Sequence, residues 1–560
     1  MPAMRRGRRA RTSKWPVILS AAAFAGMLIF SLAPFPSSDA APFPPRKSFI
    51  SNQILSNLAP TNDQGDDGGK QPSRDRRLRI FMPADRPDIN LCKAIMSGVA
   101  VGYPLPTLLN WDGDFNRPDW HFGGSHIAKL ESLLSVIEEL LSHAEDAHDD
   151  DLALMIDAYD IWFQLPPAVL IERFHQLNRE ADERNQKAWY DLINATDADP
   201  ADFPISPPKQ SIIVTTAKDC FPTSSSGSDP HYEHWPESPM PEDMYGEGTD
   251  ELTPPLYDSA RKYKKVRPRC VNSGMIMGTM GSLKAALQRC KEKVDRVAKD
   301  GRQLWSDQAL FGEVIGDQEG WRDWVRGLAE TWNGTAAQIR PGKMDRHIAN
   351  IAGQALQGRR FEFGIGLDYN FTTIPATCSA EEDGEFVRIS NATNLELMSR
   401  AAGVPDGNRV RGTPPELMDA PRDGLLEGVD WGEEPLYTDF FFGVTPAGIH
   451  HNAYIANLKP YRLKEWWSRM WFYPRLRELV TRNLEAGAQS TRLLLNYTKT
   501  DEGGVAYRAD KGSKVTVYNP VRGQHLAHYD EISWDGVCQK GSKPWHGALF
   551  GDDKGPLEAS

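Results

Sequence analysis

Two aspartates three residues apart, Asp157 and Asp160, are the most informative pair in the sequence. They follow the apolar run 152–156, which has the pattern of a buried central strand. Ligands of open α/β sheets bind beyond the carboxyl ends of the strands, so both carboxylates should face one site. Mg²⁺ and Mn²⁺ prefer such oxygen ligands. Ordinary helix capping by Asp160 is the alternative that the spacing leaves open.

Two adjacent histidines, His450 and His451, follow an apolar stretch at 440–444. Neutral imidazole is a common ligand of transition metals. We therefore expect His450 to complete a metal site with Asp157 and Asp160. For His451 we expect a surface position.

Two further segments carry residues suited to binding or proton transfer. In the segment 270–278, Asn272 is followed by the small residues Ser273 and Gly274, which let the backbone approach a ligand closely. Asp307 and Gln308 stand at a predicted helix start, where they could orient a substrate or move a proton. A tight turn and a helix cap are the alternative interpretations.

The elements that must position these residues alternate along the chain. Strand-like runs occur at 78–82, 107–111, 152–156 and 211–215. Helix-like stretches occur at 90–101, 129–143 and 169–177. This alternation predicts an α/β fold with a mostly parallel sheet flanked by helices. We expect irregular insertions near 222–262 and 379–435, and a tail at 492–545 whose strand-like pieces extend the sheet or form a small lobe.

The N-terminus predicts the compartment. A basic segment, 1–14, precedes the uncharged run 15–35, which is long enough to span a bilayer as a helix. The basic flank should stay cytosolic, so we expect a type II signal-anchor. A signal peptide cleaved near Ala40-Ala41 is the alternative. The Pro-, Ser-, Asp- and Gly-rich residues 36–75 predict a flexible stem before a lumenal domain at 76–560.

Composition agrees with this layout. The chain has 560 residues and a formal net charge of -12, so we expect no nucleic-acid partner. Six widely spread cysteines permit disulfides but do not reveal their pairing. Asn-x-Thr sequons, typical of secretory proteins, occur at Asn194, Asn333, Asn370, Asn391 and Asn496. The anchor and stem predict a Golgi membrane, with the endoplasmic reticulum as the alternative.

Taken in chain order, the motifs resemble the glycosyltransferase domain of the procollagen-lysine glycosyltransferase/hydroxylase proteins and its fungal-type, membrane-anchored relatives. The resemblance spans roughly residues 78 to 470, and the order of the motifs makes it specific. The motifs are Asp157-Ala-Tyr-Asp160, Lys218-Asp219-Cys220-Phe221-Pro222, Asn272-Ser273-Gly274, Asp307-Gln308, Gly366-Leu367-Asp368-Tyr369 and His450-His451-Asn452.

The family implies a GT-A fold, in which a Rossmann-like sheet binds a UDP-sugar with Mn²⁺ (or Mg²⁺). By this resemblance the metal ligands are Asp157, Asp160 and His450. The catalytic group is Asp307, Gln308 and Asn272. The donor-binding group is Lys129, Gly124, Asp157, Ser273 and Gly274, with the lysine meeting a phosphate as a point charge. For Lys129 a solvated helix edge is the alternative.

The expected function is therefore metal-dependent transfer of a sugar from a nucleotide-sugar to a protein or glycan acceptor in the secretory pathway. Ser306 stands where the family often has the first acid of an acidic pair. This departure keeps open a non-catalytic, sugar- or nucleotide-binding scaffold of the Golgi, since a fold does not imply a function. A metal-dependent phosphoesterase would need more acidic or histidine ligands than we find.

Overall fold

The structure is a computed structural model, in which the chain divides into the units 1–42 and 43–560. It describes residues 49–58, 75–117, 119–120, 123–196, 199–250, 262–338, 344–419, 426–499, 504–521, 527–540, 543–555 and 557. All described residues belong to the second unit. The predicted cytosolic tail, the predicted anchor at 15–35 and most of the predicted stem lie outside them.

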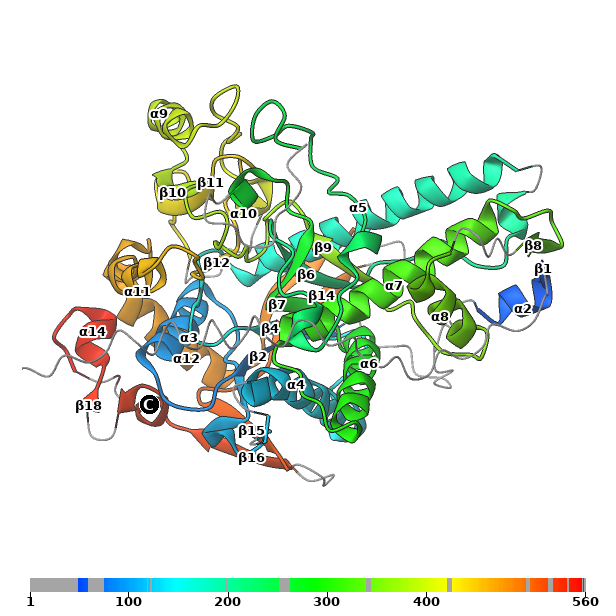
Figure 1. Ribbon diagram of the computed structural model, residues 1–560. Coiled ribbons are helices and arrows are strands. Elements are labelled where there is room, and N and C mark those ends of the chain that lie inside the picture. The colour runs from blue at the N-terminus through cyan, green and yellow to red at the C-terminus, as the bar shows by residue number, and fades with distance from the viewer. Residues whose placement is uncertain are drawn as a thin grey trace, which may run out of the picture. The chain divides into compact units, whose positions relative to one another are not determined.

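A ten-stranded sheet runs through the described part of the chain (Figure 1). Its main path has the order β16-β15-β3-β2-β4-β7-β6-β9, and β14, which pairs with β13, joins the start of β2. β2 is parallel to β3, β4 and β14, while β7 is antiparallel to β4 and β6. The strands are β2 (Asp75–Pro83), β3 (Thr107–Leu109), β4 (Leu152–Ile156), β6 (Ile212–Ala217), β7 (Cys270–Thr279), β9 (Ile365–Asp368), β13 (Arg492–Tyr497), β14 (Val505–Ala509), β15 (Val515–Pro520) and β16 (Ala527–Ile532).

Two hydrophobic cores lie on opposite faces of this sheet. Along β4, Leu154 and Ile156 belong to one core, and Ala153 and Met155 belong to the other. The first core takes residues from α3 (Ile89–Val101), α5 (Pro167–Asn194) and α12 (Leu476–Gln489). The second takes residues from α4 (Gly123–His143), α6 (Met280–Lys299) and α7 (Asp307–Ala329). Burial on both faces explains the unbroken apolar run at 152–156 and confirms the predicted α/β fold with a mostly parallel sheet.

Shorter elements surround this centre. Paired strands are β1 (Phe49–Ser51) with β8 (Ala336–Gln338), β5 (Ile161–Phe163) with β12 (Gly448–His450), β10 (Gly384–Arg388) with β11 (Pro435–Asp439), and β17 (Gln539–Lys540) with β18 (Lys543–Pro544). Helices are α2 (Asn52–Ser56), α8 (Arg346–Ala355), α9 (Ala392–Ala402), α10 (Pro415–Asp419), α11 (Leu458–Glu465), α13 (Trp534–Val537) and α14 (His546–Phe550).

Two segments that were predicted to be irregular are packed in the structure. Residues 49–56, predicted as part of a flexible stem, form β1 and α2 and bury Ile50 and Leu55 in a third core. The predicted insertion at 222–262 buries Trp235 and Tyr245, so this irregular segment contributes to the packed interior. The tail extends the sheet through β13 to β16, which confirms the first of the two alternatives predicted for it.

Two disulfides join distant parts of the chain. Cys92 of α3 bonds to Cys538, and Cys220 bonds to Cys270 at the start of β7. Among the described residues, no helix combines the length and the apolar composition needed to cross a bilayer.

Candidate metal centre

The turn between β4 and β5 presents the two aspartates. The backbone N–H of Asp157 donates to the carbonyl of Gly274 in β7, at 2.9 Å, which fixes the start of the turn. Asp160 comes directly before β5, so it leads into a strand. The helix-cap interpretation of Asp160 is therefore wrong.

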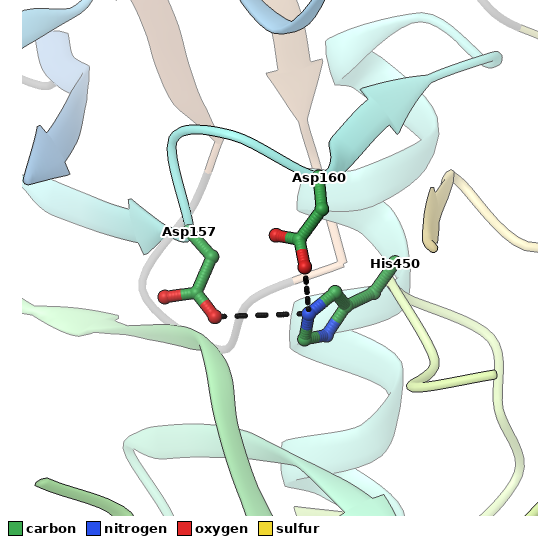
Figure 2. A group of neighbouring side chains, drawn as sticks. All are labelled: Asp157, Asp160 and His450. Carbon is green, nitrogen blue, oxygen red and sulfur yellow. Dashed lines mark ion pairs between the residues drawn. The ribbon is translucent and has the colours of Figure 1, made fainter. Parts of the chain in front are cut away.

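β12 brings His450 to these aspartates, because it pairs with β5 and places His450 opposite Ile161. The imidazole Nε2 lies 3.3 Å from Asp160 Oδ2 and 3.7 Å from Asp157 Oδ2 (Figure 2). One ligand atom from each of the three residues lies within 4.8 Å of the others. The predicted ligands thus form one group, which we call the triad.

The triad fits a divalent cation. Asp160 and His450 are buried, whereas the side chain of Asp157 is 35% exposed, so the group is open on the Asp157 side. His450 Nδ1 is buried and has no hydrogen-bond partner among the described residues. Nε2 is the nitrogen that faces both carboxylates. Two carboxylates and one imidazole can therefore meet a single cation.

The position of the His450 ring requires a glycine at residue 274. A Cβ at this position would overlap the imidazole ring of His450 and approach Asn272 Oδ1 to 2.9 Å. The backbone N–H of Gly274 donates to the same Oδ1, at 3.0 Å. The prediction that small residues here admit a ligand is thus corrected at Gly274, since a protein side chain fills the space.

Replacing Gly274 by alanine should weaken Mn²⁺ binding by about tenfold or more, because the added methyl group displaces His450 from the triad. Mn²⁺ titration followed by electron paramagnetic resonance measures this change. Gly327 of α7 is the matched control, because a Cβ there meets nothing within 4 Å. Gly327→Ala should leave Mn²⁺ affinity unchanged, and an equal loss in both variants would contradict the assignment.

A lysine is hydrogen-bonded to the carboxylate oxygen of Asp160 that faces His450. Lys459 of α11 donates to Asp160 Oδ2 at 2.5 Å, and its side chain is 45% exposed. Burial alone would raise the pKa of Asp160, but His450 and then Lys459 outweigh burial and hold the pKa below its usual range. Asp160 is therefore ionised, and Lys459 neutralises it where a metal would bind. No motif in the sequence pointed to Lys459 as a site residue.

Lys459→Met should tighten Mn²⁺ binding by about fivefold, because the ammonium competes with the cation for Asp160 Oδ2 and a partly exposed ion pair is worth up to ~1 kcal/mol. The same Mn²⁺ titration tests this. Lys464 lies on the same helix, is exposed and binds Glu465, so Lys464→Met is the control. Weaker Mn²⁺ binding in Lys459→Met would contradict the competition.

A second cluster of charges adjoins the triad. Lys129 of α4 donates to Asp157 Oδ1 at 2.6 Å and to the carbonyl of Ser273 at 2.9 Å, and its Nζ lies 2.9 Å from Asp307 Oδ2. The hydroxyl of Ser273 also donates to Asp307 Oδ2, at 2.9 Å. Lys129 therefore links the metal-facing Asp157 to Asp307 at the start of α7.

The predicted phosphate contact of Lys129 is corrected by this geometry. An ammonium group has three donors, and all three meet oxygen acceptors of the protein. Lys129 is buried, so the solvated helix edge is also wrong. Its role is to position Asp157 and Asp307.

Burial alone would raise the pKa of Asp307, but Lys129 and then His126 outweigh it and hold the pKa well below the usual range. Burial would lower the pKa of Lys129, but Asp157 and Asp307 reverse this and raise it. The pair is therefore ionised at neutral pH. A carboxylate with such a low pKa is a poor general base, because an effective base has a pKa near the working pH.

Three other predicted residues support the site in different ways. Gln308 accepts from the backbone N–H of Ser273 at 3.2 Å and donates to the carbonyl of Phe221. Asn272 accepts from Gly274, so both amides position backbone. A Cβ at Gly124 would overlap the backbone of Arg117, so close packing at the start of α4 requires this glycine.

His451 is not at the surface, as we had expected. Its side chain is fully buried, with ring centroids 4.1 Å from Trp162 and 5.7 Å from Trp466. Burial holds the pKa of His451 well below its ordinary value. It is a neutral core residue beside the triad.

Comparison of the chain with known protein families and with curated proteins finds no match.

Proposed function

We propose that this chain is a metal-dependent glycosyltransferase of the GT-A fold, related to the procollagen-lysine glycosyltransferase domains, that transfers a sugar from a UDP-sugar to a protein or glycan acceptor. The observation that carries the proposal is the triad of Asp157, Asp160 and His450 at the carboxyl end of the central strand β4. The two disulfides support a lumenal body, because such bonds persist in oxidising compartments. We propose a Golgi membrane, with the endoplasmic reticulum as the alternative.

The strand order supports a nucleotide-binding site at the carboxyl ends of β2, β3 and β4. The chain runs from β2 to β3 on one side of β2 and then to β4 on the other. Ligands of open α/β sheets bind at such a reversal, in the crevice beyond the carboxyl ends of the strands. Asp85, beyond the end of β2, and Tyr159, beyond the end of β4, are hydrogen-bonded there at 2.9 Å. The nucleoside of the donor would lie at this crevice.

The ligand atoms of the triad favour Mn²⁺ over Mg²⁺, because imidazole suits transition metals while Mg²⁺ prefers oxygen ligands alone. Asp157, Asp160 and His450 would hold the ion. When bound, it would neutralise charge that develops on the leaving diphosphate. Lys459, released from Asp160, would lie next to the same diphosphate with an exposed ammonium group.

One further side chain is suited to bind and orient the sugar. Asp307 is ionised and held by Lys129 and Ser273, so it suits acceptance of a hydrogen bond from a sugar hydroxyl. In the transfer, the acceptor oxygen bonds to the anomeric carbon and the bond from that carbon to the diphosphate breaks. The acceptor hydroxyl gives its proton to water, and UDP leaves.

Ser306 does not by itself favour a non-catalytic scaffold. Its hydroxyl accepts from the backbone N–H of Ala309 at 3.1 Å and caps α7. A serine at this position therefore has a structural reason that is independent of turnover.

The test is release of UDP by the purified full chain across a panel of UDP-sugars, with Mn²⁺ or with EDTA. The proposal predicts Mn²⁺-dependent release from one donor. Binding of a donor without turnover, even with glycoprotein and glycan acceptors added, would favour the scaffold. Binding of none of the donors would contradict the proposal altogether.

A further inference from the structure

Two partly exposed aromatic side chains stand together beside Asp307. The ring centroids of Phe221 and Trp305 are 6.3 Å apart, with the planes inclined by 48°. Phe221 is 39% exposed, although phenylalanine is among the residue types most often buried. We call these two residues the aromatic pair.

Both rings are held on fixed backbone. The Trp305 indole N–H donates to the carbonyl of Ser225 at 3.0 Å, and its backbone N–H donates to the carbonyl of Ser226 at 3.2 Å. A Cβ at Gly123 would overlap the backbone of Trp305, so α4 packs directly against this segment. Phe221 follows the disulfide-bonded Cys220. Such fixation lowers the entropy that a ligand loses on binding to exposed rings.

The aromatic pair is continuous with the proposed catalytic site. Trp305 precedes Ser306 and Asp307, while the carbonyl of Phe221 accepts from Gln308. The contacts lead from the triad through Asp157 and Lys129 to Asp307. The aromatic pair therefore adjoins the Asp307 end of the proposed site, which we take as the side from which an acceptor approaches a donor sugar.

We infer that the aromatic pair binds a pyranose ring of the acceptor, so that the acceptor is a glycan or glycoside; this rests on the proposed transferase function. A pyranose has an apolar C–H face that stacks on an aromatic ring and a rim of hydroxyls that needs polar partners. The exposed imidazole of His126, whose Nδ1 lies 3.6 Å from Asp307 Oδ1, supplies a polar group beside Asp307. A bare peptide acceptor gains less from this combination.

The test separates transfer from donor hydrolysis in the full chain. Methyl β-galactopyranoside and methyl α-mannopyranoside serve as acceptors, with the donor that the chain hydrolyses. Phe221→Ser and Trp305→Ala should lower kcat/KM for the glycoside by about 10- to 100-fold, the order of magnitude for loss of an aromatic ring that stacks on a nucleobase. UDP release to water, without acceptor, should stay within about twofold of the wild type. Trp305→Phe, which keeps a ring, should restore most of the transfer.

Tyr190→Ala is the matched control, because this ring on α5 is 40% exposed and should affect neither reaction. If the wild type and both variants hydrolyse the donor and also transfer the sugar to the glycoside equally well, the inference is overturned and the transferase proposal stands. Transfer to peptides but to neither glycoside would also overturn it. A wild type that neither hydrolyses nor transfers would defeat the proposed function itself.

Discussion

Replacing Asp160 by asparagine should lower metal-dependent UDP release by on the order of 10²- to 10³-fold. Asp160 offers the oxygen that lies 3.3 Å from His450 Nε2, so the substitution removes the only charged ligand among the two buried members of the triad. Asparagine keeps the shape of the side chain, and Lys459 is free to turn toward solvent. The loss should therefore come from weaker metal binding and not from unfolding.

Kinetics across a Mn²⁺ series distinguishes these causes. The apparent Mn²⁺ requirement should rise, while the midpoint of thermal unfolding in EDTA should change little. Asp150→Asn is the control, because Asp150 precedes β4, is largely exposed and pairs with Arg76. Full activity of Asp160→Asn at micromolar Mn²⁺ would remove the triad from the mechanism.

The second large effect concerns stability. Lys129→Met should destabilise the fold by about 3–5 kcal/mol, because it leaves buried Asp307 without its cation. Methionine has a similar volume, so packing changes contribute less.

The loss should depend on pH. In the wild type, the pKa of Asp307 is held below its usual range, so its stabilising contribution is present above the unfolded value of about 3.9 and lost below it. Without Lys129, only His126 opposes the effect of burial, so that pKa rises. The ionised form then carries a cost at neutral pH that disappears as Asp307 takes up a proton.

Urea unfolding at about pH 7 and at about pH 4.5 measures this, and the difference between wild type and variant should shrink at the lower pH. Lys187→Met, at an exposed pair with Asp191 on α5, should change stability by less than about 1 kcal/mol at both values. A Lys129→Met loss that is equal at the two pH values would show that charge is not its cause.

The sheet could be predicted because its signals are local. The run 152–156 is apolar throughout because both faces of β4 are buried, and this fixed the position of Asp157 and Asp160 beyond its end. The alternation of strands and helices likewise predicted the layers. In contrast, β1 and α2 are stabilised by Ile50 and Leu55 against a distant part of the chain, which composition alone could not reveal.

The candidate site was predictable only in part. His450 was proposed from its residue type, but its place beside Asp160 depends on the pairing of β12 with β5, a contact that no local pattern encodes. For the same reason Lys459 was missed, and His451 was placed at the surface although Trp162 and Trp466 enclose it. Lys129 was predicted to contact a phosphate, but its contacts with Asp157 and Asp307, which are distant in sequence, show that it positions carboxylates.

The most direct test of the central claim is the location of manganese in crystals of the full chain grown with MnCl₂ and UDP. The anomalous signal should give one peak within about 2.3 Å of Asp160 Oδ2, an Asp157 carboxylate oxygen and His450 Nε2, with the diphosphate of UDP on its open side. UDP bound at the carboxyl end of β4 without that peak, or a manganese peak elsewhere, would contradict the assignment of a metal-dependent donor site.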